Sequence, residues 1–134
     1  MEEENIEATI LPFYNGNNLP FFEEFVFQDT DDILNTPWTK NDLFAHQVIN
    51  THDFGKFTIS SKGEIFDNRY YDPVGTLADD VKDITIKALK EGKAWFETRD
   101  KVTPCKDCIY KYLCPSPSNY ELALGRNNLC HIQV

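Results

Sequence analysis

Four cysteines in the last thirty residues are the strongest candidates for chemistry in this chain of 134 residues. Cys105, Cys108, Cys114 and Cys130 follow one another with the spacing C-x2-C-x5-C-x15-C. A C-x2-C pair lets two thiolates reach one metal from a tight turn, and two further thiolates complete a four-sulfur shell. Such a shell suits tetrahedral Zn²⁺ or an iron–sulfur cluster. The spacing therefore predicts a metal or cluster site, and the alternatives are unrelated buried thiols or one disulfide.

The other residues that could do chemistry give a weaker signal. His131 directly follows Cys130, and because adjacent residues seldom both face one metal, we expect it beside the site or at the surface. His46 and His52 have no serine or cysteine nucleophile in a recognisable frame. The glycines form no phosphate-binding loop. We therefore predict no catalytic residue and favour a protein that is not an enzyme.

Charge and the absence of targeting signals limit the partners and the location. The net charge of −9 argues against nucleic acid and anionic membranes as partners. Residues 1–39 contain nine acids and no Lys or Arg, which predicts either an acidic surface for a basic partner or a solvated face. Acids also stand where a secretory signal would carry positive charge, and no apolar run is long enough to span a membrane. We expect a cytoplasmic, reducing location, where cysteines hold metals more often than disulfides.

The elements that would position the cysteines indicate an α+β fold. Residues 56–60 and 64–66 alternate around a glycine turn, which predicts a β-hairpin. A helix is expected over residues 76–91, with Thr76 as N-cap and Gly92 at its end. Its buried face is predicted from residues at helical spacing, namely Leu77, Val81, Ile84 and Ala88. The prolines and cysteines that come next favour an irregular segment without a long helix or strand. This segment follows the hairpin, which is expected to pack on the helix.

The first fifty residues predict a separate acidic segment rich in aromatic residues. A strand is expected over residues 7–14, with an open edge to which a peptide can add, and a helix over residues 19–27. A second helix is expected to begin at Thr39 and to bury Leu43 and Val48. The nearby aromatic residues form either core or an exposed patch that favours a homodimer: Phe21, Phe22, Phe25, Phe27 and Trp38. The predicted division is residues 1–50 and residues 51–134.

Residues 57–130 resemble a SPASM domain, the C-terminal auxiliary iron–sulfur module of radical S-adenosylmethionine enzymes that modify peptides. The family pattern runs from a hairpin with G-x4-C, through a helix, to C-x2-C-x5-C-x3-C and a final cysteine. Gly63 is present here, but Asn68 and Ser118 stand where the family has cysteines. In the family those two positions serve the first auxiliary cluster. The resemblance therefore implies one remaining [4Fe-4S] cluster, bound by Cys105, Cys108, Cys114 and Cys130.

The residues around the cysteines resemble a narrower group, the pseudo-radical-SAM and grasp-with-SPASM proteins of Bacteroidales peptide systems. The matching segments are residues 12–16, 50–56, 105–110, 113–121 and 128–131. As in the pseudo type, the chain lacks the radical-SAM motif C-x3-C-x2-C.

This resemblance implies a non-catalytic domain that recognises or positions a ribosomally made peptide, or docks its maturation enzyme. The alternatives are an electron-transfer accessory to a peptide-modifying enzyme and a structural zinc domain for protein–protein contact. Because these relatives are much longer, we expect the chain to be their C-terminal piece, with residues 1–50 as the end of a larger barrel-like domain or a bridge.

Overall fold

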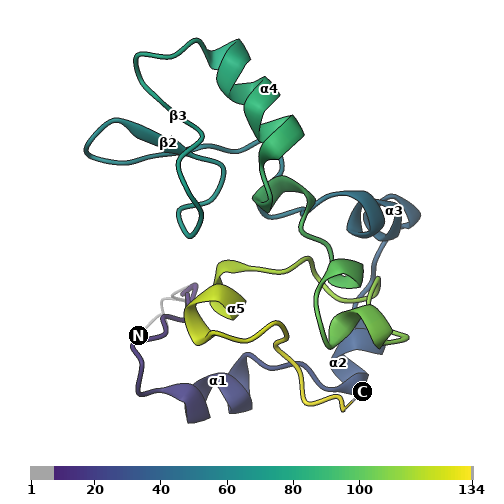
Figure 1. The fold of residues 1–134 in the computed structure, drawn as a ribbon. Coiled ribbons are helices and arrows are strands. Elements are labelled where there is room, and N and C mark those ends of the chain that lie inside the picture. Colours follow the sequence, from purple (N-terminus) through teal and green to yellow (C-terminus); the bar gives the residue numbers. More distant parts are fainter. Residues whose placement is uncertain (1–7, 134) are drawn as a thin grey trace, which may run out of the picture.

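The computed structural model describes residues 8–133, which form two lobes (Figure 1). The sheet lobe, at the top of Figure 1, contains the three strands and helix α4. The cysteine lobe, below it, contains α1, α2, α5 and most of the C-terminal coil, with α3 at its side. The helices and the small sheet confirm a mixed α+β fold. No helix within residues 8–133 is long and apolar enough to cross a bilayer.

The sheet lobe is built on three short antiparallel strands. These are β1 (Thr58–Ile59), β2 (Glu64–Phe66) and β3 (Gly75–Thr76), in the order β1-β2-β3. The predicted hairpin of β1 and β2 is confirmed, and its turn contains Gly63 at a φ of +80°, which glycine adopts without steric cost. The third strand was not predicted.

Helix α4 (Val81–Glu91) begins later than the sequence predicted. Its N-cap is Asp80, which accepts a hydrogen bond from the backbone N–H of Lys82. Ile84 and Ala88 are buried as predicted. Leu77 and Val81 were wrongly assigned to the buried face, because both lie at or before the first turn, where they are mostly exposed.

Close packing determines where α4 ends and which residues form the apolar core beside it. Gly92 ends the helix as predicted, and a Cβ there would lie 2.5 Å from the carbonyl oxygen of Ala88. Ile84 packs with residues of β2 and of the loop after it, and Ala88 packs on Trp95. The small sheet and the helix therefore share one apolar interface.

Three short helices begin the cysteine lobe: α1 (Leu19–Phe25), α2 (Thr30–Asn35) and α3 (Lys40–Val48). Thr39 and Asp42 form the predicted capping box of α3. The predicted buried face of α3 was wrong, because Leu43 is half-buried and Val48 exposed, whereas His46 is buried. The His46 and Trp38 rings form a T-shaped pair, which explains why a histidine occupies this interior position.

The aromatic residues near α1 divide between core and surface. Phe22 and Phe27 are buried, whereas Phe21 and Phe25 are exposed and pack on each other with ring centroids 5.1 Å apart. Trp38 is half-buried. Part of the group is therefore core and part of it is exposed.

The expected strand over residues 7–14 is wrong for residues 8–14, which form coil, while residue 7 lies outside the described part. This coil has no neighbouring strand among the described residues. Side chains hold this coil instead. The Tyr120 hydroxyl donates to the carbonyl of Pro12, and the side-chain amide of Asn18 donates to the carbonyl of Phe13.

The C-terminal part consists of single turns and one short helix. The turns are η1 (Ala94–Phe96), η2 (Arg99–Lys101) and η3 (Cys105–Asp107), and the helix is α5 (Asn119–Leu124). The prediction that no long helix or strand forms here is confirmed. Ser118 and Glu121 form a capping box at the start of α5, and Gly125, at a φ of +68°, ends it.

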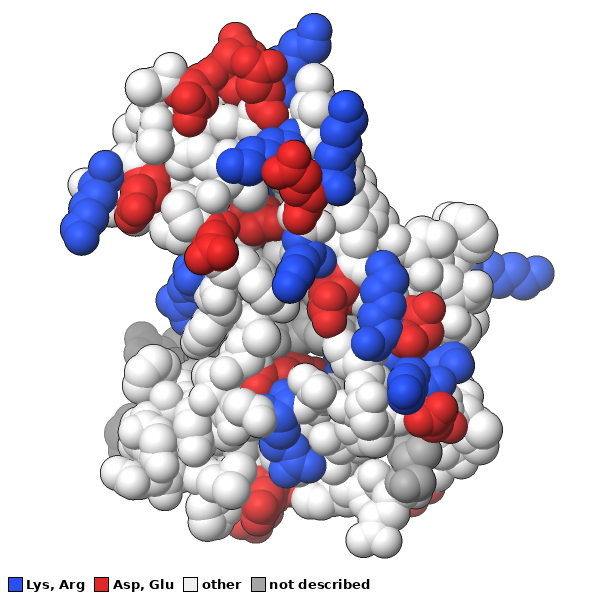
Figure 2. All heavy atoms as spheres, viewed as in Figure 1, with Lys and Arg blue, Asp and Glu red and all other residues white. Residues whose placement is uncertain are grey.

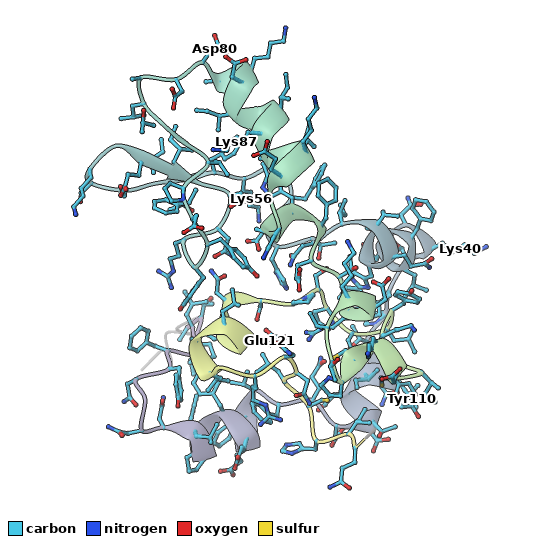
Figure 3. All side chains as sticks on the ribbon, viewed as in Figure 1. Lys40, Lys56, Asp80, Lys87, Tyr110 and Glu121 are labelled. Atoms are coloured by element: carbon cyan, nitrogen blue, oxygen red, sulfur yellow. The ribbon has the colours of Figure 1, made fainter. Side chains whose placement is uncertain are left out.

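On one face of the molecule, charged side chains are denser over one lobe than over the other. On the face in Figure 2, acidic and basic side chains are interspersed over the sheet lobe, and the lower part of the same face carries fewer of them. In Figure 3, Lys40 and Asp80 lie at the periphery, whereas Glu121 lies inside the cysteine lobe. Glu121 is only 4% exposed, so this carboxylate requires a partner.

Candidate metal centre

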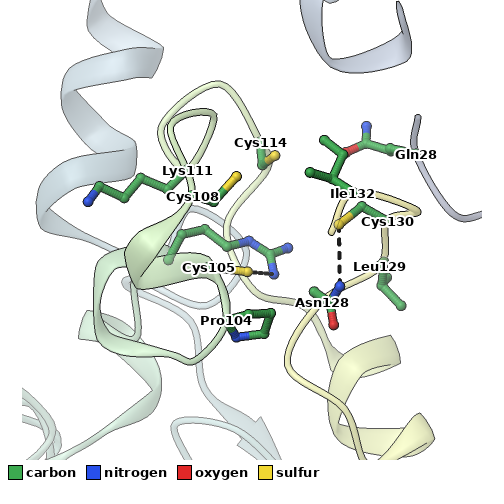
Figure 4. Close-up of a pocket in the computed structure, with 11 residues that line it drawn as sticks. Gln28, Pro104, Cys105, Cys108, Lys111, Cys114, Asn128, Leu129, Cys130 and Ile132 are labelled. Atoms are coloured by element: carbon green, nitrogen blue, oxygen red, sulfur yellow. Dashed lines mark hydrogen bonds between the residues drawn. The ribbon is translucent and has the colours of Figure 1, made fainter. Parts of the chain in front are cut away.

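The structure brings the four cysteines together around one hollow in the cysteine lobe (Figure 4). The hollow has a volume of about 30 Å³, more than a single water-sized sphere occupies. The cysteines are free thiols that come from separate turns and coils. Among the other lining residues are Gln28, Arg99 and Asn128. Residues far apart in the sequence therefore meet at this point.

The first three cysteines are held by two turns, the second of which contacts the N-terminal segment. The backbone N–H of Cys108 donates to the carbonyl of Cys105 at 3.0 Å, which closes the C-x2-C turn. Cys114 ends a second turn, and two side chains of the N-terminal segment contact this turn. Trp38 Nε1 donates to the carbonyl of Leu113 at 2.6 Å, and His46 Nδ1 lies 2.8 Å from the carbonyl oxygen of Tyr112.

Cys130 is held by a parallel β-bridge to Gln28. The Gln28 N–H donates to the carbonyl of Leu129 at 2.9 Å, and the His131 N–H donates to the carbonyl of Gln28 at 3.0 Å. The exposed His131 ring lies 2.7 Å from the carbonyl oxygen of Glu23 and does not line the hollow. This position agrees with the expectation of a residue beside the site or at the surface.

Arg99 is the main residue of the site that the sequence did not reveal. Its side chain is buried between the cysteines and α5, with Nη2 2.5 Å from the Oε1 atom of Glu121. Burial alone would lower the pKa of Arg99, but the neighbouring Glu121 raises it above its ordinary value, so the guanidinium stays charged. The S-x-x-E pattern of the α5 capping box was a signal for Glu121. No local pattern marked Arg99.

Two N–H donors point at cysteine sulfurs. Arg99 Nη1 lies 3.8 Å from the Sγ atom of Cys105, and Asn128 Nδ2 lies 3.3 Å from the Sγ atom of Cys130 (Figure 4). Hydrogen bonds of this kind stabilise thiolates and tune the centres that thiolates bind.

Burial keeps two of the thiols protonated in the absence of a cation. It raises the pKa of Cys105, and it raises that of Cys114 to about 11, while Arg99 opposes the shift at both. The other cysteines raise both values further, because neighbouring thiolates repel one another. A metal that binds here therefore has to displace protons.

The four thiols fit a thiolate-bound centre chemically, but their side chains have to move closer together to bind a single metal ion. Among residues 8–133 no three Cys, His, Asp or Glu side chains are placed to hold one metal ion. With Zn–S bonds of about 2.3 Å, a tetrahedral zinc site needs sulfurs about 3.8 Å apart. Four thiols and two N–H donors around one hollow suit zinc or a [4Fe-4S] cluster chemically.

Asn68 and Ser118, at the positions where the resembling family has cysteines, lie next to a second hollow. Asn68 Nδ2 donates to Asp53 Oδ2 at 3.0 Å and to Asn119 Oδ1 at 2.6 Å, and Ser118 caps α5. The second hollow has a volume of about 510 Å³. It lies between the coil of residues 11–14, the loops of the sheet lobe and the start of α5. Hydrogen-bonded amide and carboxylate side chains therefore lie beside the second hollow.

We expect Asp53→Asn to raise the unfolding temperature at pH 7. Burial raises the pKa of Asp53 above its ordinary value of 3.8, so the folded state binds the proton more tightly than the unfolded state. Stability is then lost as the pH rises from 3.8 through the folded pKa, and at neutral pH the loss is complete. Asparagine avoids this loss and still accepts from Asn68. The gain should disappear below about pH 3.8 in thermal scans.

The exposed Asp72→Asn is the matched control for this experiment, and its unfolding temperature should stay close to that of the unchanged chain. A lower unfolding temperature for Asp53→Asn at pH 7 would contradict the prediction.

The two remaining histidines do not join the cysteines. His46 is buried and is used in the contacts with Trp38 and Tyr112, which is a structural role. His52 is exposed at the edge of the second hollow.

No protein-family model, no curated protein and no solved structure matches this chain. The resemblance to SPASM domains therefore rests on the sequence motifs.

Proposed function

We propose that this chain is a non-catalytic domain that binds one [4Fe-4S] cluster and positions a ribosomally made peptide or its maturation enzyme. The observation that carries the proposal is the meeting of four thiols from separate segments around one hollow. The ligands would be Cys105, Cys108, Cys114 and Cys130. When bound, the cluster supplies cross-links between these segments and a centre able to exchange one electron.

Zinc is the alternative occupant of the same four thiols, because thiolates bind both zinc and iron–sulfur clusters. The cluster is proposed first because the SPASM domains that the cysteine motifs resemble bind one with cysteines at these four positions. With zinc, the protein would be a structural domain for contact with other proteins. In either case a site closed by four thiolates leaves no open position for a substrate, which supports a non-catalytic role.

The second hollow supports the peptide part of the proposal. Its volume of about 510 Å³ lies within the range of ligand sites, and its lining combines aromatic rings with charged groups. Tyr14, Tyr70 and Tyr120 supply the rings, and Asp53 and Arg69 supply charges of opposite sign.

A homodimer through the exposed pair Phe21 and Phe25 is part of the same proposal, since these two rings form an apolar patch on α1.

The test is metal and sulfide analysis of the chain purified without oxygen, together with an absorption spectrum. We expect about four irons per chain and broad visible absorption. Cys108→Ser should lose both, because one of four ligands is removed. Lys106→Ala is the matched control: it lies in the same turn, is exposed, and should keep the full iron content.

A colourless protein with one zinc per chain would support the zinc alternative instead of the cluster. Protein that is folded but contains no metal, and takes up neither iron nor zinc after anaerobic reconstitution, would contradict metal binding altogether.

A further inference from the structure

We infer that Arg99 and Glu121 together assemble the four-cysteine site and set its charge, which makes Arg99 a positioning residue for the metal centre. This inference rests on the proposed metal binding and adds to it. It assigns the control of affinity to a buried ion pair outside the four ligands.

One guanidinium reaches each of the three chain segments that carry cysteines. Arg99 Nη1 lies 3.8 Å from the Sγ atom of Cys105. Its Nε donates to the carbonyl of Pro115 at 2.9 Å, next to Cys114 in the sequence. Nη1 also donates to the carbonyl of Asn127 at 3.1 Å, in the coil that leads to Cys130. Arg99 therefore ties together segments that have no shared helix or strand to hold them.

Glu121 fixes the orientation of this guanidinium. Its Oε1 atom accepts from Arg99 Nη2 at 2.5 Å, and its Oε2 atom accepts from the backbone N–H of Ser118 at 2.8 Å. The Ser118 hydroxyl donates to the same oxygen. The carboxylate is thus held at the first turn of α5, and Arg99 cannot turn away from the cysteines without breaking a buried pair.

Arg99 is also the cation that faces the sulfurs. Among the described residues that line the hollow, Lys111 is the other cation, but its amino group donates to the carbonyl of Lys106 at 2.9 Å. Figure 4 shows the Lys111 side chain extending away from the cysteines. The positive charge next to the thiols is therefore that of Arg99.

The charges predict opposite effects for the two partners. Four thiolates around Zn²⁺, or around an oxidised [4Fe-4S] core, leave a net charge of −2, which is unfavourable when buried without a counter-charge. Arg99 supplies that counter-charge, and Glu121 cancels part of it. Loss of the Arg99 fork should weaken metal binding, whereas loss of the Glu121 charge should strengthen it.

The experiment measures Zn²⁺ affinity of the full, reduced, metal-free chain by competition with a chelator. We expect Arg99→Lys to bind Zn²⁺ about 10-fold to 100-fold more weakly, as is usual when a partner of a metal ligand is changed. Glu121→Gln keeps a hydrogen-bonding side chain in the capping box and should bind Zn²⁺ several-fold more tightly. Glu91→Gln, exposed on α4, removes the same charge far from the site and should leave the affinity unchanged.

Opposite signs separate this inference from a purely structural role, in which both variants disturb the contacts between the segments and both lose affinity. Equal losses in the two variants, or an unchanged affinity in Arg99→Lys, would overturn the inference while metal binding by the unchanged chain stands. If Arg99→Lys does not fold, a gain in Glu121→Gln supports the inference and a loss overturns it. Failure of the unchanged chain to bind Zn²⁺ would overturn the inference and the zinc alternative, whereas failure to take up both Zn²⁺ and iron would overturn the proposed metal binding.

Discussion

Arg99→Met should lower the free energy of unfolding of the metal-free chain by about 3–5 kcal/mol, because it leaves Glu121 as an unpaired buried charge. The same change removes the donors to the carbonyls of Pro115 and Asn127. Small domains are stable by only about 5–15 kcal/mol, so most of the stability would be lost. Urea denaturation followed by circular dichroism measures the change.

Two further variants test whether the lost pairing is the cause. Arg99→Met combined with Glu121→Gln should recover about 1–2 kcal/mol relative to the single variant, since no unpaired charge remains and glutamine keeps the cap. Arg69→Met is the matched control, because Arg69 is exposed and its guanidinium lies over the ring of Tyr70, 5.2 Å from the ring centroid. It should cost about 1 kcal/mol or less. A cost for Arg99→Met as small as that of the control would show that the buried pair does not support the fold.

The sequence predicted the meeting of the cysteines better than it predicted what surrounds them. A C-x2-C turn is a local feature, and the family pattern connected it to Cys114 and Cys130. Arg99 acts across the fold, because each of its contacts lies 6 to 28 residues away in the sequence. No periodicity or spacing marks such a residue.

The start of α4 shows how a correct local pattern gave a wrong boundary. Thr76 and Asp79 do form the expected contacts: the Asp79 carboxylate accepts from the N–H of Thr76 at 2.8 Å. These bonds close a turn, and Thr76 pairs with Glu64 as part of β3. Asp80 is the true cap. The helix boundary was decided by Asp80, an acceptor four residues after Thr76, and by the pairing of Thr76 with β2.

The N-terminal coil was misassigned for a related reason. Residues 8–14 contain β-branched and aromatic residues and precede a turn, as strands often do. A strand also needs a neighbour, and sequence alone does not show whether one is present. The capping box of α3 and the hairpin turn at Gly63 were predictable because each is complete within a few residues.

Phe22→Ala should destabilise the chain by about 3–5 kcal/mol, as expected for removal of a fully buried aromatic ring. Phe22 is 0% exposed and packs against Tyr14 and Tyr120, with ring centroids 5.6 Å and 5.5 Å away. Phe25→Ala is the matched control on the same helix, since Phe25 is 66% exposed, and it should cost about 0.5 kcal/mol or less. Urea denaturation of both variants measures the difference.

The same variant tests whether the N-terminal segment and the cysteine segment unfold together. Contacts between them recur along their length: the β-bridge from Gln28 to Cys130, the bond from Trp38 to Leu113, and the bond from Asn50 Nδ2 to the carbonyl of Pro117 at 2.8 Å. Because these contacts hold the turns that carry the cysteines, Phe22→Ala should also weaken Zn²⁺ binding, whereas Phe25→Ala should not. Unfolding of the N-terminal segment in Phe22→Ala with Zn²⁺ affinity unchanged would contradict this coupling, and would mean that the cysteine segment holds its site without the helices before it.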